Sequence, residues 1–378
     1  MNIAIDCRPL QNRYADRGVG TVVRNLLKHL VSSRCSSSLI LCGNAPQPPM
    51  RCGRYVMLRR PATHDWMQEQ LRWPFDLRAL RAGIFHSTVS LGLIREIGFP
   101  LVCGTKSIAT VFDLNALHTP SLLPHVKMKS FLVQKTALRR ADRVIVISNF
   151  VKNDLIARLK IKDSRIRVLP LAVDETVAKT FDRFSLDSAL PQDPFLLTLG
   201  EDEHKNVGTA VAVFERLCER SFSGTLRVIG TLERQTDAVK RAVRLSRYRE
   251  RIVFTGAVTP EQLVANYALC RLFLFPSRLE GFGLPVIEAM YCGAPVVASN
   301  ASAVPEAGGE AALYCDPDDI GAFTTAVERV LDDDAFRNDL VRRGMAHARV
   351  RNWSEAMEKV LSIYEELGAV FTPPAGKA

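Results

Sequence analysis

Residues 271–293 of the chain read RLFLFPSRLEGFGLPVIEAMYCG. The hydrophobic run 272–275 predicts a buried strand. Pro285 predicts the first turn of a helix, because proline has a fixed φ and lacks an N–H that could go unbonded there. Gly293 is suited to end this helix. A buried strand that leads through a glycine-containing loop into a helix is typical of parallel α/β sheets.

The loop in this stretch predicts a phosphate-binding site. Gly281 and Gly283 allow the backbone to approach a ligand closely. The amides of 282–284 lie near the positive end of the expected helix dipole, where phosphates bind. Glu280 and Glu288 flank this loop, and we expect them to accept hydrogen bonds from hydroxyl groups on either side of the phosphate. A capping loop with two incidental glutamates is the alternative interpretation of the glutamate spacing alone.

The rest of the chain alternates short hydrophobic runs with longer amphipathic segments. Strands are expected at 2–6, 38–42, 55–58, 84–86, 108–112, 143–147, 195–199, 225–229, 251–254, 272–275, 295–298 and 312–315. Helices are expected at 19–32, 67–82, 126–140, 149–158, 207–220, 234–247, 260–268, 285–291, 318–332, 335–350 and 354–367. The alternation predicts an α/β fold with parallel sheets covered on both faces.

The length of 378 residues favours two domains. We expect an N-terminal Rossmann-like domain over 1–174 and a second one over 175–353. The polar segment 174–193 is the expected linker. A last helix within 354–378 would pack back toward the first domain before a disordered tail. Ligands of such sheets bind beyond the carboxyl ends of the strands, so a cleft between the two domains is the expected active site.

Composition and charge narrow the class of protein. The chain is 47% hydrophobic and has a net charge of +10. Residues 1–174 hold 27 Lys and Arg against 11 Asp and Glu, whereas residues 175–378 hold 23 against 29. The basic first half predicts an anionic partner, which could be a lipid surface, a diphosphate-linked acceptor or nucleic acid. Nucleic acid is the least favoured of the three, because no RNA- or DNA-binding motif occurs.

The cysteines and the hydropathy pattern indicate a cytoplasmic protein. None of the nine cysteines has C-x-x-C spacing, so we expect small buried hydrophobes and neither disulfides nor a zinc site. Residues 1–6 are interpreted as a first strand and not as a signal peptide. No run of 18 apolar residues occurs, which argues against a transmembrane helix.

Several segments together resemble the retaining glycosyltransferases of family 4, which have the GT-B fold. The segment 280–288 is similar to the E-x7-E signature of that family. Four other stretches also match it: Arg17-Gly18-Val19-Gly20-Thr21 its glycine loop, Val144 to Ser148 its strand–Ser–helix element, Val168 to Asp174 its interdomain motif, and Gly293 to Ser299 with Pro305-Glu306 its C-terminal pattern. The resemblance covers most of the chain.

The resemblance implies a role for each candidate site residue. Glu280 would hold hydroxyls of a donor sugar, and Glu288 would hold the ribose of its nucleotide. Lys205, which lies between a strand and a helix, would bind the diphosphate. The remaining donor contacts would come from Gly18, Gly20 and the amides of Phe282, Gly283 and Leu284. Catalytic roles would fall to Glu280, Lys205 and Asp113.

Two positions depart from the family pattern. An arginine usually follows the glycine that ends strand 195–199, but Glu201 follows Gly200 here, and this acid would repel a diphosphate unless it turns away. The His-Asp-Leu element of the family is Phe112-Asp113-Leu114 in this chain, so the histidine that contacts the donor sugar is absent. His118 lies near enough in sequence to replace it; a loop histidine without a role is an equal alternative.

The implied activity is hexosyl transfer without a metal or cofactor. The features are most similar to those of members that use GDP-mannose, although rhamnosyl-, fucosyl- and glucosyltransferases share them. The acceptor would be a glycan or a lipid-linked glycan of surface polysaccharide or lipopolysaccharide synthesis. No D-x-D motif occurs in a donor-loop context; Asp316-Pro317-Asp318 and Asp332-Asp333-Asp334 are expected to cap or coat helices. The alternatives are a nucleotide-sugar epimerase on the same fold and a catalytically degenerate nucleotide-sugar binder.

A basic amphipathic surface is expected in the first half. Residues 127–140 predict a helix with basic residues and an apolar face, and Trp66, Trp73 and Phe75 lie close in sequence to two arginines, Arg72 and Arg78. Such a surface would bind an anionic membrane leaflet at the inner face of the cell membrane. An ordinary solvated helix face is the alternative.

Overall fold

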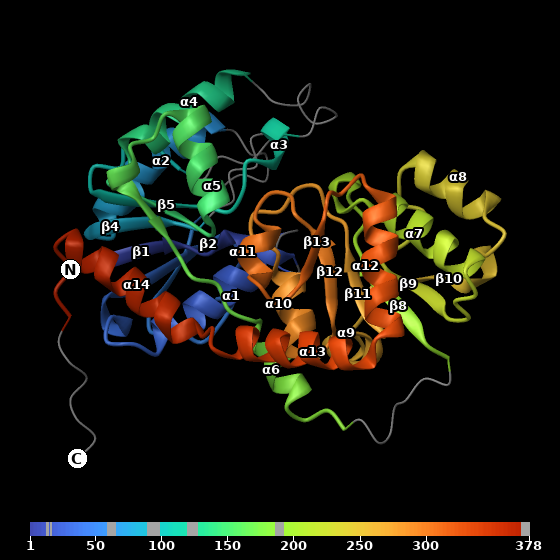
Figure 1. Cartoon of the computed structure of the whole chain (residues 1–378). Helices are drawn as coiled ribbons and strands as arrows, with labels where there is room; N and C mark the ends of the chain where they lie inside the picture. The colour runs from blue at the N-terminus through green and yellow to red at the C-terminus, as the bar shows by residue number, and fades with distance from the viewer. Residues whose placement is uncertain are drawn as a thin grey trace, which may run out of the picture. The chain divides into compact units, whose positions relative to one another are not determined.

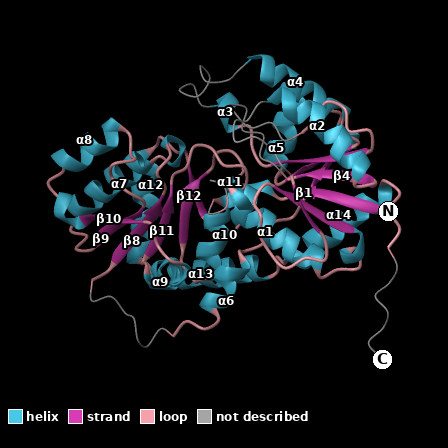
Figure 2. Cartoon of the chain, turned by 180° about the vertical axis from the view of Figure 1, so that it is seen from behind, coloured by secondary structure: helices cyan, strands magenta, loops and turns pink. Residues whose placement is uncertain are grey.

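The computed structural model describes residues 1–12, 15, 17–58, 66–88, 99–118, 128–185 and 193–371. The chain divides into two compact units, Met1–Leu171 with Asn352–Ala378, and Ala172–Arg351 (Figure 1). In each unit the strands form a central layer with helices on both faces (Figure 2). The expected disordered tail, 372–376, lies outside the described residues.

The N-terminal unit contains a parallel sheet, for which the described residues supply seven strands in the order β3-β2-β1-β4-β5-β6-β7. The strands are β1 Asn2–Asp6, β2 Leu39–Gly43, β3 Tyr55–Met57, β4 Ala82–Ser87, β5 Lys106–Val111, β6 Arg143–Val146 and β7 Ile166–Val168. The chain reverses its direction of growth between β1 and β4, as in a doubly wound sheet.

Helices cover both faces of this sheet. One face carries α1 Gly18–Val31 and α14 Trp353–Glu366, which contact each other. The other carries α2 Trp66–Ala79, α4 Met128–Arg140 and α5 Asn149–Asp154, the last continued by the π-helical turn η4 Leu155–Leu159. The short helix α3 Asn115–His118 follows β5. Trp73 of α2 is fully buried in the core, so the prediction that it lies on a membrane-facing surface is wrong.

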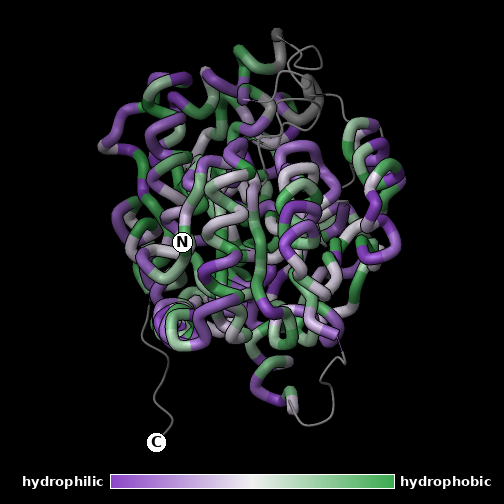
Figure 3. Tube along the Cα trace, turned by 45° about the vertical axis from the view of Figure 1, so that its right-hand side comes forward, coloured by the Kyte–Doolittle hydropathy of each residue, from purple (hydrophilic) through white to green (hydrophobic). Residues whose placement is uncertain are grey.

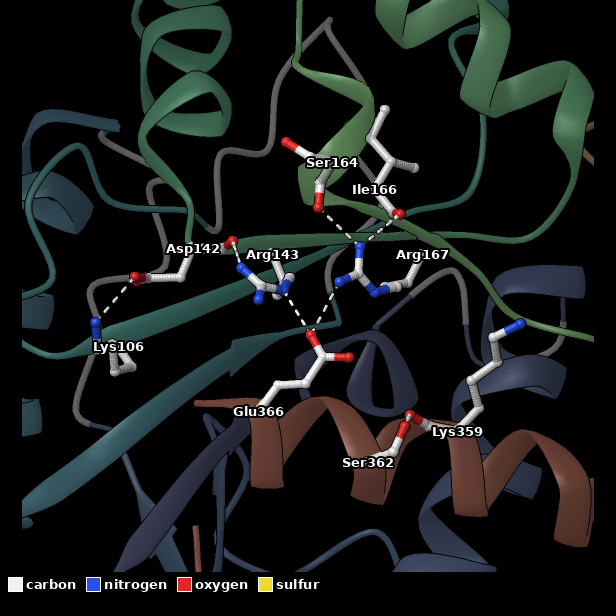
Figure 4. Close-up of polar contacts among 9 residues, drawn as sticks. All are labelled: Lys106, Asp142, Arg143, Ser164, Ile166, Arg167, Lys359, Ser362 and Glu366. Atoms are coloured by element: carbon white, nitrogen blue, oxygen red, sulfur yellow. Dashed lines mark hydrogen bonds and ion pairs between the residues drawn. The ribbon is translucent and has the colours of Figure 1, made fainter. Parts of the chain in front are cut away.

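The last helix, α14, is fastened to the N-terminal unit by charged and polar contacts. Glu366 lies between Arg143 of β6 and Arg167 of β7, with its Oε2 at 2.9 and 3.0 Å from their guanidinium nitrogens (Figure 4). Deeper in the unit, the Tyr364 hydroxyl lies 2.8 Å from Nδ1 of the fully buried His86. These bonds explain why a helix at the end of the chain belongs to the first unit.

The C-terminal unit is a second doubly wound sheet. Its described strands have the order β10-β9-β8-β11-β12-β13, all parallel. They are β8 Phe195–Leu199, β9 Thr225–Ile229, β10 Ile252–Gly256, β11 Leu272–Phe275, β12 Val296–Ser299 and β13 Leu313–Cys315. The buried run LFLF of β11 lies in the middle, which confirms the strand predicted from that run.

Several helices of this unit are amphipathic. Hydrophilic and hydrophobic residues alternate along the coloured trace of the chain (Figure 3). One face of the sheet carries α7 Val207–Glu219, α8 Asp237–Leu245 and α12 Ile320–Asp332. The other helices are α6 Glu175–Phe181, α9 Pro260–Leu269, α10 Leu284–Tyr291, α11 Val304–Gly308 and α13 Asp334–Arg349. The parallel α/β fold predicted from the sequence is therefore confirmed.

Several short elements differ from the sequence prediction; among them, the helices α3 and α11 were not expected. The expected linker 174–193 begins with a helix, α6, which Asp174 caps by accepting a hydrogen bond from Thr176 N at 2.8 Å. The edge strand β7 was not among the expected strands either, and its last residue, Val168, begins the stretch that matches the interdomain motif. All nine cysteines are free, and burial raises the pKa of several of their thiols. The expectation of buried small hydrophobes holds for all but the partly exposed Cys52.

Candidate functional site

The loop between β11 and α10 has the predicted strand–loop–helix geometry. Gly283 precedes the helix with φ of +114°, a conformation that side-chain-bearing residues rarely adopt. Pro285 lies in the first turn, no acidic residue does, and no side chain caps the helix. No side chain therefore competes with an anionic ligand for the amides at this end, and the binding of phosphate by them stays a prediction. Gly293 follows the helix with φ of +82° and ends it.

Lys205 and Glu280, which are 75 positions apart, form an ion pair. The Lys205 Nζ lies 2.7 Å from the Glu280 Oε1. Only 16% of the lysine side chain and 11% of the glutamate side chain are exposed. The ammonium also lies 5.4 Å from the centre of the Phe275 ring. The two residues follow β8 and β11, which are neighbours in the sheet, so the topology brings them together at the carboxyl edge.

Backbone-directed hydrogen bonds hold the two loops to each other. The carbonyl of His204, next to Lys205, accepts from Arg278 N at 2.8 Å and from Ser277 Oγ at 3.1 Å. These bonds fix the distance between the lysine loop and the glutamate loop before any ligand arrives.

Two further residues fix the site, and the sequence analysis did not select them. Asn206 has a left-handed φ of +57°, and its amide group donates to the carbonyls of Pro276 and Pro317 at 3.1 and 2.8 Å. Ser302, with φ of +53°, accepts from Glu280 N at 2.8 Å. An asparagine directly before a helix tolerates the left-handed region, which was a usable sequence signal for Asn206; no such signal marks Ser302.

Glu288 lies in α10 and is 9% exposed. Burial, and after it the nearby negative charge of Asp174, together raise the pKa of its carboxyl to about 8. The Lys205 cation and the Tyr267 hydroxyl act in the opposite direction. That hydroxyl is buried, close to Glu288, but outside hydrogen-bonding geometry with any described residue. Glu288 thus lies within electrostatic reach of Lys205, and its surroundings favour the protonated carboxyl more than water does.

The raised pKa of Glu288 predicts a pH dependence of stability. Its pKa is about 8 in the folded protein against 4.5 for the ordinary group, so its contribution to stability is complete below pH 4.5 and is lost as the pH rises to 8. We expect the melting temperature of the wild type, relative to that of Glu288→Gln, to fall between pH 5 and pH 8 and then to level off. Thermal unfolding in a buffer series measures this difference, and a pH-independent difference would contradict the assignment.

Glu201 does not stand free beside Lys205. Its Oε1 accepts from the backbone N and the Oγ1 of Thr231 at 3.0 and 3.2 Å, and its Oε2 lies 2.7 Å from a guanidinium nitrogen of Arg234. The loop after β9 thus binds and neutralises the carboxylate. This arrangement answers the concern that an acid at this position would repel a diphosphate.

The candidates in the N-terminal unit lie at the carboxyl ends of its strands and at a helix start. Gly18 and Gly20 lie in the first turn of α1, so the expected glycine loop is part of the helix. Phe112 is buried, with 3% exposure. Asp113 follows β5, and its Oδ1 accepts from Asn115 N at 3.0 Å.

Polar contacts engage both ring nitrogens of His118. Its Nε2 lies 2.7 Å from Asp154 Oδ2, and its Nδ1 lies 3.2 Å from a guanidinium nitrogen of Arg158. The same Arg158 binds Asp154. A histidine with both nitrogens engaged has none left to accept a proton from a substrate, so this geometry favours the structural interpretation of His118.

The segment 332–334 provides a helix cap, as predicted, whereas an aspartate of the segment 316–318 forms an ion pair with the loop after β11. Asp318 pairs with Arg278, and Asp333 caps α13 by accepting from Phe336 N. The described residues contain no group of three or more His, Cys, Asp or Glu side chains placed to hold a metal ion. Metal independence stays a prediction.

Two family models match complementary halves of this chain. The model described as Glycosyltransferase Family 4 matches residues 17–177, and the model described as Glycosyl transferases group 1 matches residues 193–333. The second match contains Lys205, Glu280 and Glu288, and the first contains Asp113 and both glycines of α1. The chain belongs to glycosyltransferase family 4.

Curated relatives of this family 4 chain include two mannosyltransferases of Escherichia coli. The chain is 29% identical over 280 residues to the serotype-specific mannosyltransferase WbdA of Escherichia coli, a match that covers 69% of this chain and 34% of WbdA. It is 27% identical over 271 residues to the O-antigen chain mannosyltransferase B of Escherichia coli, which covers 69% of this chain and 71% of that protein. The matched part thus spans about a third of WbdA.

Solved structures share the fold of the family 4 chain. HepE from Anabaena, solved with UDP-glucose, has a TM-score of 0.72 and 12% identity, with 97% of this chain and all of that chain covered. At this identity the likeness supports the two-unit GT-B fold alone.

None of the helices in the described part of the chain combines the length and apolar character that crossing a bilayer requires.

Proposed function

We propose that the protein is a retaining hexosyltransferase that takes mannose from GDP-mannose and adds it to a glycan or lipid-linked acceptor of a surface polysaccharide or lipopolysaccharide. The observation that carries this proposal is the Lys205–Glu280 pair, whose glutamate lies in the loop that precedes α10, a helix whose N-terminus no side chain caps. The choice of mannose rests on the similarity to WbdA and to mannosyltransferase B.

The site offers positive charge where a leaving diphosphate becomes more negative. As the bond between the sugar and the diphosphate breaks, Lys205 and the amides of Phe282, Gly283 and Leu284 would stabilise the growing charge. Glu280 would accept hydrogen bonds from sugar hydroxyls, and Glu288 from the ribose. In retaining transfer the acceptor hydroxyl attacks from the face of the leaving group. The diphosphate oxygen can therefore take its proton, and Phe112 in place of histidine does not block the reaction.

The test is product analysis with labelled donors and cell membranes as the source of acceptor. We expect label from GDP-mannose in a membrane glycan, and an α-linked product whose anomeric configuration matches that of the donor by NMR. A β-linked product would refute retention, and transfer from UDP- or TDP-sugars alone would refute the GDP-mannose assignment. Epimerised nucleotide sugar without glycan would establish the epimerase alternative; binding without any product would establish the degenerate binder.

The acceptor would be held near an anionic lipid surface by the N-terminal unit. Leu71 and Phe75 of α2 are 63% and 74% exposed, one helical turn apart, and Arg78 lies in the last turn of the same helix. On α4, Leu132 is 52% exposed, and basic residues occupy the last turn. Exposed apolar side chains among cations are typical of helices that rest on a membrane interface.

Replacing Leu71 and Phe75 together by serine tests this surface. Because both side chains are exposed, we expect an unchanged melting temperature but a loss of most co-sedimentation with vesicles of phosphatidylglycerol and phosphatidylcholine. Leu245→Ser, at a 70% exposed leucine of the C-terminal unit, is the matched control and should sediment like the wild type. Equal sedimentation of all three proteins would contradict the membrane assignment.

A further inference from the structure

We infer that the Lys205–Glu280 ion pair distinguishes the two nucleotides of the reaction cycle and disfavours the nucleoside diphosphate relative to the nucleotide sugar. The inference rests on the proposed function, because it assumes that Lys205 meets a diphosphate. It adds a second role for Glu280: this residue sets how readily the nucleoside diphosphate leaves the site.

The geometry fixes the carboxylate close to any anion on Lys205. The Lys205 Nζ already donates to Glu280 Oε1 at 2.7 Å. A phosphate oxygen bonded to the same ammonium would lie about 4.5 Å from that carboxylate oxygen, given ordinary hydrogen-bond lengths and tetrahedral N–H directions. The backbone at both positions is held in place, because Glu280 N donates to Ser302 Oγ and the His204 carbonyl next to Lys205 accepts from two donors.

Burial makes this proximity costly. The two side chains are only 16% and 11% exposed, so water screens the carboxylate–phosphate repulsion poorly. The part of the chain that the structure describes offers no second cation in an ion pair with Glu280. A nucleoside diphosphate therefore takes over the positive charge of Lys205 and leaves the carboxylate uncompensated.

A nucleotide sugar avoids this penalty. Its hexose brings hydroxyl groups, which can donate hydrogen bonds to Glu280 and replace the bond that Lys205 gives up. Once the hexose has been transferred, its hydroxyl groups leave with the glycosylated acceptor. The ion pair can then re-form, which favours release of the nucleoside diphosphate over its retention.

The variant Glu280→Gln separates these effects. Glutamine keeps the size of the side chain and removes its charge. We expect GDP, UDP and inorganic pyrophosphate, whichever of these bind the wild type, to bind about tenfold more tightly to the variant in isothermal titration calorimetry. The nucleotide sugar should gain no affinity, so the preference for sugar over diphosphate shrinks.

The control is Glu328→Gln, which removes the same charge from an exposed pair with Arg220 in the same unit. This control should bind all ligands like the wild type. If the wild type binds a nucleoside diphosphate and Glu280→Gln binds it no more tightly, the inference is wrong while the proposed function stands. If the wild type binds neither nucleotides nor nucleotide sugars, the proposed function fails, and the inference fails with it.

Discussion

Lys205→Met is expected to reduce kcat/KM for glycosyl transfer about 10³-fold, the scale on which single charge-stabilising groups act in transfer reactions. Lys205 is the cation whose Nζ lies 2.7 Å from Glu280 at the carboxyl edge of the C-terminal sheet. Methionine preserves the length and the apolar stem beside Phe275 but removes the charge that would meet the leaving diphosphate. Initial rates with GDP-mannose and an acceptor extract measure the effect.

Two further variants serve as controls for the Lys205→Met prediction. Lys205→Arg keeps a cation with altered geometry and should recover part of the rate. Lys240→Met removes an equivalent charge from α8, where the lysine pairs with Asp237 at the surface, and should leave the rate unchanged. Transfer by Lys205→Met at the wild-type rate would remove the central residue from the proposed mechanism.

The fold was largely predictable because its signals are local and repeated. Buried runs such as 272–275 and proline or glycine at helix ends recur along the chain, and each predicts its element without knowledge of the others. The short elements were missed for physical reasons. Strand β7, Ile166–Val168, has an arginine at its centre, so no hydrophobic run marks it. Helix α6 begins in a polar segment, although Asp174 followed by Glu175 is an N-terminal helix signal.

Side-chain direction was harder to predict than secondary structure. Trp73 and Phe75 are two positions apart on α2, so they point to different sides: Trp73 is fully buried and Phe75 is 74% exposed. Proximity to arginines in the sequence therefore misassigned Trp73. Likewise, no local pattern reveals that Asp154 and Arg158 occupy the nitrogens of His118, because these partners come from another helix.

In the candidate site, too, single residues could be predicted from the sequence, whereas the interactions between them could not. The loop 280–284 and Lys205 could each be selected from the sequence, because glycine, proline and lysine at such places have a direct physical meaning. Their ion pair could not, since it depends on β8 and β11 being neighbours in the sheet. The raised pKa of Glu288 was equally hidden, because its causes are burial and the charge of Asp174, which lies 114 positions away in sequence.

Gly200→Ala is expected to raise the KM for the donor at least tenfold and to lower the free energy of unfolding by about 1–3 kcal/mol. Gly200 ends β8 with φ of +134°, which strains any other residue. An added Cβ would lie within 2.4 Å of the Cβ and Cγ of Lys205, so the lysine must move away from Glu280.

Gly293→Ala separates strain from displacement: its φ is +82°, and the nearest atom to its added Cβ is a methionine sulfur at 3.8 Å. This control should lose stability but keep the donor KM, as measured by thermal unfolding and steady-state kinetics. If both variants raise KM equally, backbone strain is the cause, and the position of Lys205 does not control donor binding.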